Sequence, residues 1–234
     1  NYYPKGHYKA MSHNTVMKHI QRLRKMVTLA FHLEWLDKDP FRRWKMIFEK
    51  REREFLSKNE LSNLQHAEIP IDRLDRIRDL FIFSCYTGLS YGDLMKLSEE
   101  EISIGIDGKA WIITTRNKTN NAVKVPLLEP VLGILKKYED HPITQATGKL
   151  LPECSNQKVN LYLKELAMMV GIKKNLTFHM SRHTFATTVT LSNGVPIETV
   201  SKLLGHTKIA TTQIYARVLE DKISKEMTDL SKKL

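Results

Sequence analysis

Hydrophobic residues recur every three or four positions between Ser12 and about Leu36, which is the spacing of a one-sided α-helix. The positions that share this spacing are Val16, Ile20, Leu23, Val27, Ala30 and Phe31. Asp39-Pro40 breaks the chain after this helix, because the residue before a proline is disfavoured in a helix. The pattern therefore predicts a small helical unit over residues 1–50.

A charged stretch, KREREFLS, follows, and we assign residues 51–58 to a linker. Ser57 and Glu60 have the spacing of a capping box, so a new helix begins there. Alternating apolar positions separated by turn residues predict three strands. Further helices are predicted around them. The strands are 102–106, 110–115 and 123–125, and the other helices are 72–86, 90–97, 130–138, 156–170, 178–191, 196–204 and a run from about 209.

The predicted fold class is therefore mainly α. It comprises a small helical N-terminal domain and a mainly helical second domain, 59–234, that contains one small three-stranded antiparallel sheet. A charged tail with apolar residues at helical spacing begins at about residue 219. The chain begins NYYPKGHYKAMS, without an initiator Met, and we expect it to be a fragment of a longer protein.

Composition adds a strong positive charge. The 37 Lys and Arg residues outnumber the 26 Asp and Glu residues, which gives a formal net charge of +11. Such an excess favours binding to polyanions such as nucleic acid, although charge alone leaves open a basic protein with no such role. Neither a membrane span nor a signal peptide is evident, and two cysteines form no disulfide framework, so we expect a cytoplasmic protein. Basic residues expected to contact phosphate are Lys18, Arg22, Arg24, Lys25, Arg42 and Arg43.

Candidate chemistry is concentrated near the C-terminus. His179, Arg182 and His183 are spaced i, i+3 and i+4, so a helix presents them on one side. His206 closes the sequence SKLLGH, and Tyr215 follows nine residues later. A tyrosine hydroxyl beside histidine and arginine can attack a phosphodiester, while the cations stabilise the charge that develops on the phosphorane oxygens. These residues predict DNA strand cleavage and rejoining by covalent catalysis.

Each of these residues also has a simpler interpretation. Arg182 can fork onto two phosphate oxygens or form a surface ion pair. His179 can exchange a proton near neutral pH, whereas His183 is expected to be a buried supporting histidine. His206 is placed in the site by its closeness to Tyr215, but a histidine can simply cap a helix. Tyr215 can also be a packing residue.

With HMSRH, LLGH, a tyrosine nine residues on, and TGLS upstream, the chain resembles the tyrosine recombinase (phage integrase) family over about residues 15–219. The resemblance implies a core-binding domain of SAM-like helical type in residues 1–50 and a catalytic domain that together clamp double-stranded DNA. It implies a 3′-phosphotyrosyl intermediate and no metal, nucleotide or other cofactor. Tyr215, Arg182, His179 and His206 match the family's catalytic residues. Lys118 matches its hairpin lysine, a general acid toward the leaving 5′ oxygen, with Lys124 as the weaker alternative.

One position departs from the family pattern, which has Arg after T-G-L where this chain has Ser90. Asp93, the acidic partner expected for that Arg, is present. We expect another cation to replace the missing one, with Arg78 as the first candidate and Arg116, otherwise a DNA-contacting residue, as the second. Ser after T-G-L together with R-D-L-F-x-F is similar to integrases of mobile elements in Bacteroides-type bacteria.

Beyond the chain itself, the resemblance implies a monomer without DNA, a homotetramer in the synaptic complex and accessory DNA-bending proteins, in association with the bacterial nucleoid. The tail is expected to dock on a neighbouring protomer. Two alternatives stay open at this point. One is a catalytically weakened DNA-binding regulator of the same fold, which the presence of Ser90 supports. The other is a type IB topoisomerase-like enzyme.

Overall fold

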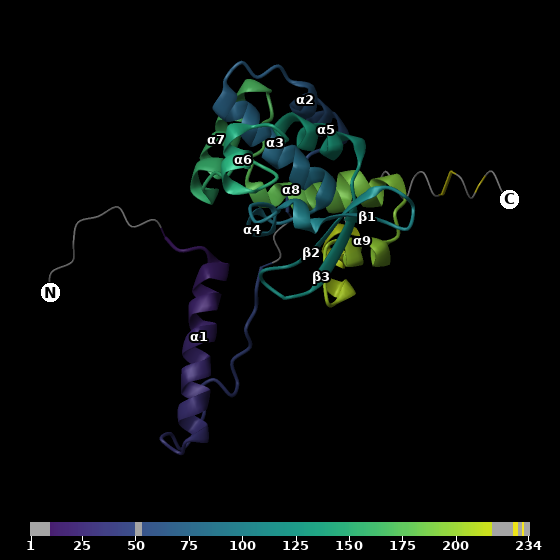
Figure 1. Ribbon diagram of the computed structural model, residues 1–234. Coiled ribbons are helices and arrows are strands. Elements are labelled where there is room, and N and C mark those ends of the chain that lie inside the picture. The colour runs from purple at the N-terminus through teal and green to yellow at the C-terminus, as the bar shows by residue number, and fades with distance from the viewer. Residues whose placement is uncertain (1–9, 50–52, 217–226, 229–230, 232–234) are drawn as a thin grey trace. The chain divides into compact units, whose positions relative to one another are not determined.

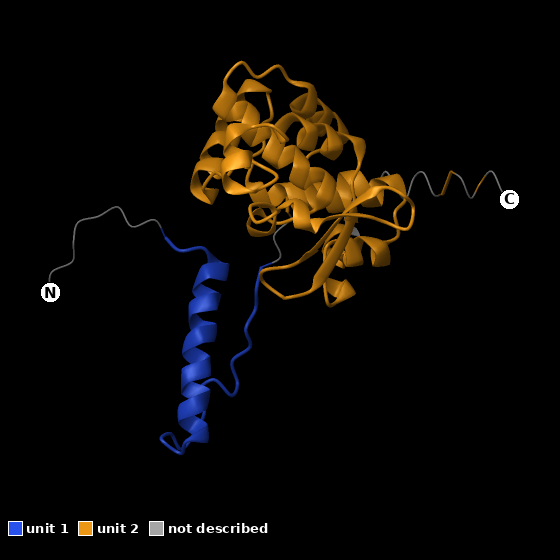
Figure 2. Cartoon of the chain, viewed as in Figure 1, with its two compact units in different colours: residues 1–52 blue, residues 53–234 orange. Residues whose placement is uncertain are grey.

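The computed structural model describes residues 10–49, 53–216, 227–228 and 231. The chain divides into two compact units, residues 1–52 and residues 53–234 (Figure 2). No helix in the described ranges is long and apolar enough to cross a membrane. The tail helix predicted from about residue 219 lies almost entirely outside the described residues.

The main element of the first unit is α1 (His13–His32). It confirms the predicted helix but ends four residues earlier than predicted. None of the α1 residues is buried. The side-chain amide of Asn14 pairs with the backbone of Glu49 through two hydrogen bonds of 2.9 Å, so the returning chain lies along the start of the helix. Arg24 is half-buried, and the other basic residues expected to contact phosphate are exposed: Lys18, Arg22, Lys25, Arg42 and Arg43.

The second unit is mainly helical, which confirms the predicted fold class. Its central helix is α3 (Asp72–Thr87), which contacts α2, α5, α7 and α8 (Figure 1). Phe81 and Phe83 on α3 are completely buried, because apolar residues cover most of this helix. The surrounding helices are α2 (Lys58–His66), α4 (Tyr91–Leu94), α5 (Glu129–Tyr138), α6 (Pro142–Thr147), α7 (Asn156–Met169), α8 (Phe178–Thr184), α9 (Ile197–Leu203) and α10 (Gln213–Ala216).

The sheet contains β1 (Ile102–Ile104), β2 (Ala110–Thr115) and β3 (Ala122–Pro126) in the antiparallel order β1-β2-β3. Ile112 pairs with Ile102 on one side and with Val125 on the other, so these apolar residues share the inner face. The sheet positions the site because α9 contacts β3 and the β2–β3 turn reaches the end of α9.

Two predicted helices differ in detail from the structure, and one helix was not predicted. The single helix expected over 178–191 is α8 followed by a π-helix (Phe185–Thr190) and a 3-10 turn (Leu191–Asn193). Hydroxyls of Thr187 and Thr190 bond to carbonyls in the preceding turn, a contact that commonly distorts helices. The helix expected over 90–97 has only four residues, Tyr91–Leu94, and α6 was missed because its six residues carry little periodicity.

The capping box at the start of α2 is confirmed. The Ser57 hydroxyl accepts a hydrogen bond from the Glu60 N–H, and the Glu60 carboxylate accepts one from the Ser57 N–H. These two bonds satisfy N–H groups that a helix start leaves without partners. The beginning of α2 is therefore fixed locally.

Truncating Phe81 tests whether α3 carries the core of the second unit. The change Phe81→Ala should lower the free energy of unfolding by about 3–5 kcal/mol, because a completely buried aromatic side chain leaves a cavity. Met168→Ala, at a side chain that is 82% exposed, should change it by less than about 0.5 kcal/mol. Urea unfolding followed by circular dichroism measures both. Equal losses would show that α3 is not central to stability.

Candidate active site

Groups from four separate segments meet at the end of α9. Arg182 comes from α8, His206 and the Leu204 carbonyl from the end of α9, and Tyr215 from α10. Arg116 comes from the turn that follows β2. Figure 1 shows α8, α9 and the sheet next to one another in the second unit. Residues that are distant in sequence therefore form one cluster.

Arg182 is the most deeply placed cation of this cluster, with 4% of its surface exposed. Its guanidinium donates hydrogen bonds to the carbonyls of Gly88 and Leu204, and it lies 3.1 Å from Nε2 of His206. Burial and, next, the charge of Arg116 lower its pKa to about 10, so it stays protonated at neutral pH. The recorded contacts occupy three of the five N–H donors of a guanidinium, which leaves two for an incoming anion.

The protonation state of His206 follows from its two partners. A guanidinium has no acceptor, so Nε2 of His206 must accept the bond from Arg182. Nδ1 therefore carries the proton and donates to the Thr212 hydroxyl at 2.8 Å. Burial and the charges of Arg182 and Arg116 lower the pKa of His206 to about 4. His206 is thus a neutral imidazole with a defined tautomer.

Tyr215 is 5% exposed and packs against two of these histidines. Its ring is nearly parallel to that of His206, with centroids 6.5 Å apart, and lies 5.2 Å from that of His183. Burial raises the pKa of the Tyr215 phenol, while the charges of Arg182, Arg53 and Arg116 act in the opposite direction. The phenol is consequently protonated and shielded from solvent in this state.

His183 and His179 lie on the other side of Tyr215. His183 is 5% exposed, and burial followed by the charge of His179 lowers its pKa to about 3, which agrees with the buried supporting role expected for it. His179 meets His183 edge-on, with ring centroids 4.5 Å apart, and lies at the exposed rim. Partial burial, and next the charge of Arg53, lower the pKa of His179. Of the pair, only His179 is accessible to a substrate.

Ser90 and Asp93 form a link between α4 and the β2–β3 turn. The Ser90 hydroxyl donates to one Asp93 carboxylate oxygen at 2.7 Å, and the other oxygen accepts from the Asn117 N–H at 2.9 Å. Nε of Arg116 lies 3.6 Å from the same carboxylate. The Arg116 guanidinium also donates to the Leu204 carbonyl at 3.1 Å, the acceptor that Arg182 uses. Arg116 is therefore part of the cluster.

Arg78 does not reach the cluster, and its assignment as the replacement cation is withdrawn. Its guanidinium donates to the Ala67 carbonyl at 2.8 Å and to the carboxylates of Asp75 and Asp79. Lys137 on α5 bonds to the same two carboxylates. The charge of Arg78 in α3 is accommodated by local ion pairs, so no functional anion is needed to explain it. Arg116, the second candidate, lies in the cluster.

The remaining predicted cations are exposed. Lys118 lies in the turn between β2 and β3, where its charge contributes to the lowered pKa of His179, and Lys124 lies on β3 opposite Ile113. Sequence reasoning missed Thr212, which bonds to His206, and Arg53, whose charge acts on Tyr215. The two threonines before QIY were a weak signal for Thr212, and the basic linker was a weak signal for Arg53.

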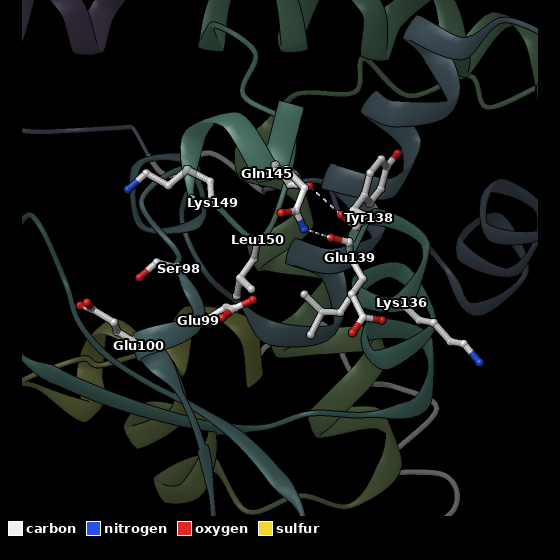
Figure 3. A pocket seen from close by; sticks show the side chains of 12 residues that line it. Ser98, Glu99, Glu100, Lys136, Tyr138, Glu139, Gln145, Lys149 and Leu150 are labelled. Carbon is white, nitrogen blue, oxygen red and sulfur yellow. Dashed lines mark hydrogen bonds between the residues drawn. The ribbon is translucent and has the colours of Figure 1, made fainter. Parts of the chain in front are cut away.

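A cavity of about 710 Å³ lies elsewhere, between the segment at Ser98 and helices α5 and α6 (Figure 3). Its lining combines Glu99 and Glu100 with Lys149, and none of the predicted site residues borders it. Among the described residues, no three His, Cys, Asp or Glu side chains lie together in a way that could hold a metal ion. The arginine–histidine–tyrosine cluster is accordingly the candidate active site.

Comparison with known proteins identifies the architecture that carries this cluster. Residues 54–222 match the model of the phage integrase family, and residues 1–46 match the phage integrase SAM-like domain. The chain belongs to the phage integrase family. Its match to tyrosine recombinase XerA of Pyrococcus furiosus is 34% identical over 153 residues and covers 62% of this chain and 51% of the relative. A tyrosine recombinase of Thermosipho africanus is 32% identical over 183 residues, covering 77% and 62%. The chain therefore spans about half to three fifths of the length of these relatives.

Solved structures of integrases share the fold. A crystal structure of XerA recombinase matches with a TM-score of 0.61 and 25% identity over 91% of this chain and 76% of that one. The Tn1549 transposon integrase, in complex with a circular intermediate DNA, matches with a TM-score of 0.69 and 17% identity over 94% and 80%. At the lower identity the likeness concerns the fold alone.

The neutral histidines of the site predict a dependence of stability on pH. His206 takes up a proton in the unfolded chain below its usual pKa of 6.5 but resists protonation in the folded one down to about 4. The unfolded state therefore binds more protons in this window, and the free energy of unfolding should fall as pH drops from 6.5 to 4. His206→Gln, which removes this titration, should flatten the slope in urea unfolding experiments. The control His32→Gln, at an exposed histidine, should leave the slope as steep as in wild type. An unchanged slope in His206→Gln would contradict the assignment.

Proposed function

We propose that this chain is the catalytic part of a site-specific DNA recombinase that cuts and rejoins strands through a 3′-phosphotyrosyl intermediate. The observation that carries the proposal is the packing of Tyr215 against His206, which is in turn bonded to the buried Arg182. A nucleophile, a proton-exchanging group and a phosphate-binding cation thus lie within one chain. The names of the relatives, tyrosine recombinases, support the same reaction.

In this mechanism the Tyr215 phenol attacks the scissile phosphorus and forms a phosphotyrosyl ester while the bond to the 5′ oxygen breaks. The two free donors of Arg182 bind non-bridging oxygens, where negative charge develops. Nδ1 of neutral His206 already holds a proton, so Nε2 takes the proton that the attacking phenol loses. This transfer requires Arg182 to turn from His206 toward the phosphate. His179 at the rim contacts the same phosphate. Lys118 delivers a proton to the leaving 5′ oxygen, and the free hydroxyl later reverses the reaction.

Arg116 supplies the second arginine in place of the one that Ser90 lacks. Three contacts support this assignment: the shared Leu204 carbonyl, the ion pair with Asp93, and the Ser90 hydroxyl, which donates to the same carboxylate oxygen that Arg116 approaches. A serine is too short to reach the site, but it keeps Asp93 oriented toward Arg116. With serine at residue 90, the second cation thus comes from Arg116, and Asp93 remains its carboxylate partner.

The wider assembly belongs to the same proposal. The exposed basic residues of α1 and residues 42–43 suit the phosphates of double-stranded DNA, which explains the net charge of +11. We further propose a monomer that forms a tetramer on DNA, accessory DNA-bending proteins, and action at the nucleoid in the bacterial cytoplasm. The sequence around Arg78 and Ser90 supports an origin in a Bacteroides-type mobile element.

The decisive test of function is a nicked suicide DNA substrate that traps the covalent intermediate. Wild-type protein should form an adduct that survives a denaturing gel, and Tyr215→Phe should form none while binding the DNA equally well. Phenylalanine keeps the packing against His183 and His206 and removes only the hydroxyl. Absence of an adduct in wild type on DNA that it binds would instead favour a non-catalytic regulator.

The two arginine candidates can be separated in the same assay. Arg116→Ala should slow adduct formation by roughly 10²- to 10³-fold, the usual effect of losing one transition-state donor, and Arg116→Lys should restore part of the rate. Arg78→Ala should leave the rate per folded molecule within about twofold, although it should lower thermal stability because Asp75 and Asp79 lose a partner. The reverse pattern would return the role to Arg78.

A further inference from the structure

The segment that leads into α2 is held in place by hydrogen bonds to its backbone. Side chains from other parts of the second unit bond to successive N–H and carbonyl groups of this segment. The Phe55 carbonyl accepts from Lys174 at 2.9 Å. The Leu56 N–H donates to the Thr184 hydroxyl at 3.0 Å, and its carbonyl accepts from the Thr188 hydroxyl. Leu56 itself is completely buried. We call this segment, residues 53–57, the strap.

The strap is attached directly to the helix that carries the catalytic residues. Thr184 is the last residue of α8 and follows His183, while Thr188 lies in the π-helix that continues from α8. Buried hydroxyl-to-backbone bonds of this kind are costly to break, since each would leave a polar group without a partner. The path of the strap past α8 is therefore as well defined as α8 itself.

Fastening Leu56 also limits where Arg53 can lie. Three residues of chain span at most about 11 Å, so Arg53 stays close to the end of α8. Its side chain is exposed, and its positive charge contributes to the pKa shifts of His179, His183 and Tyr215. No ion pair is recorded between Arg53 and any carboxylate of the described residues. Within the described residues Arg53 therefore has no carboxylate partner, and its charge acts on the histidines and the tyrosine of the cluster.

We propose that Arg53 is a further phosphate-binding residue of the active site, held there by the strap, and that its ligand is a backbone phosphodiester at or next to the scissile one. This inference rests on the proposed function, because it presupposes DNA in the site. The strap supplies the cation from outside the segments that carry the family motifs. Arg53 then adds to Arg182 and Arg116 a third guanidinium, one that is exposed before DNA arrives.

Arg53→Ala tests the proposal in two independent measurements, with Lys58→Ala as the matched control. Lys58 is an exposed cation five residues further on, at the first position of α2, so its loss changes the net charge equally. In equilibrium DNA binding, Arg53→Ala should reduce the slope of log affinity against log salt by about one, the amount expected for one lost phosphate contact. In suicide-substrate cleavage at saturating DNA, it should slow adduct formation by roughly 10-fold or more, and Arg53→Lys should recover part of the rate.

Outcomes separate this inference from the proposed function. A wild-type protein that binds DNA but forms no Tyr215-dependent adduct would refute the recombinase reaction, while the salt slope of Arg53→Ala would still decide whether Arg53 binds phosphate. Arg53→Ala that matches Lys58→Ala in both salt slope and cleavage rate would overturn the inference and leave Arg53 as an ordinary solvated residue.

A second variant tests the strap. Thr188→Val keeps the side-chain shape and removes the hydrogen bond to the Leu56 carbonyl. If the strap positions Arg53, the effect of Arg53→Ala on cleavage should be smaller in the Thr188→Val background than in wild type. Independent effects that simply multiply would show that the strap does not position Arg53. Urea unfolding of each variant confirms that the compared molecules are folded.

Discussion

The carbonyl oxygen of Leu204 is the contact on which the site depends, because the guanidinium groups of buried Arg182 and partly buried Arg116 converge on it. Arg182 and Arg116 both donate to this oxygen, which lies at the C-terminal end of α9. A helix end has carbonyls without partners and a partial negative charge, so it is a suitable place to hold cations. Gly205 makes the approach feasible: a side chain there would meet Arg116 at 2.7 Å, and its backbone φ is +62°. The two arginines are thus positioned by the main chain.

This arrangement leaves the site short of negative charge. Asp93 is the carboxylate paired with Arg116, and burial together with the charge of Arg116 lowers the pKa of Arg182, because the two guanidinium groups repel each other. Burial and, next, the neighbouring positive charges lower the pKa values of His183 and His206, so both histidines stay neutral. A phosphodiester would relieve this repulsion and at the same time favour protonation of His206. Substrate binding and readiness for proton transfer are therefore coupled by the same electrostatics.

Sequence reasoning succeeded where the information is local. The spacing of His179 and Arg182 on one helix, the capping box at Ser57, and the turn at Asp107-Gly108 each depend on a few neighbouring residues. It failed for Arg78 because two carboxylates on its own helix, which it shares with Lys137 from α5, neutralise the charge of its guanidinium. The place of Arg116 depends on a carbonyl 88 residues away, and such a contact has no signature in the sequence.

The π-helix after α8 explains how one segment can serve both the core and the site. Its threonine hydroxyls bond backward to carbonyls of the helix, and Thr188 at the same time bonds across to Leu56. A π-helix has more residues per turn than an α-helix, so the same residues point in different directions in the two kinds of helix. The π-helix therefore determines which threonine hydroxyl faces the strap. Arg182 lies six residues before Thr188 and donates to other groups, the carbonyls of Gly88 and Leu204. A displacement of the strap would therefore also displace the helix that carries Arg182. The N-terminal segment of the second unit is in this way connected to the candidate active site.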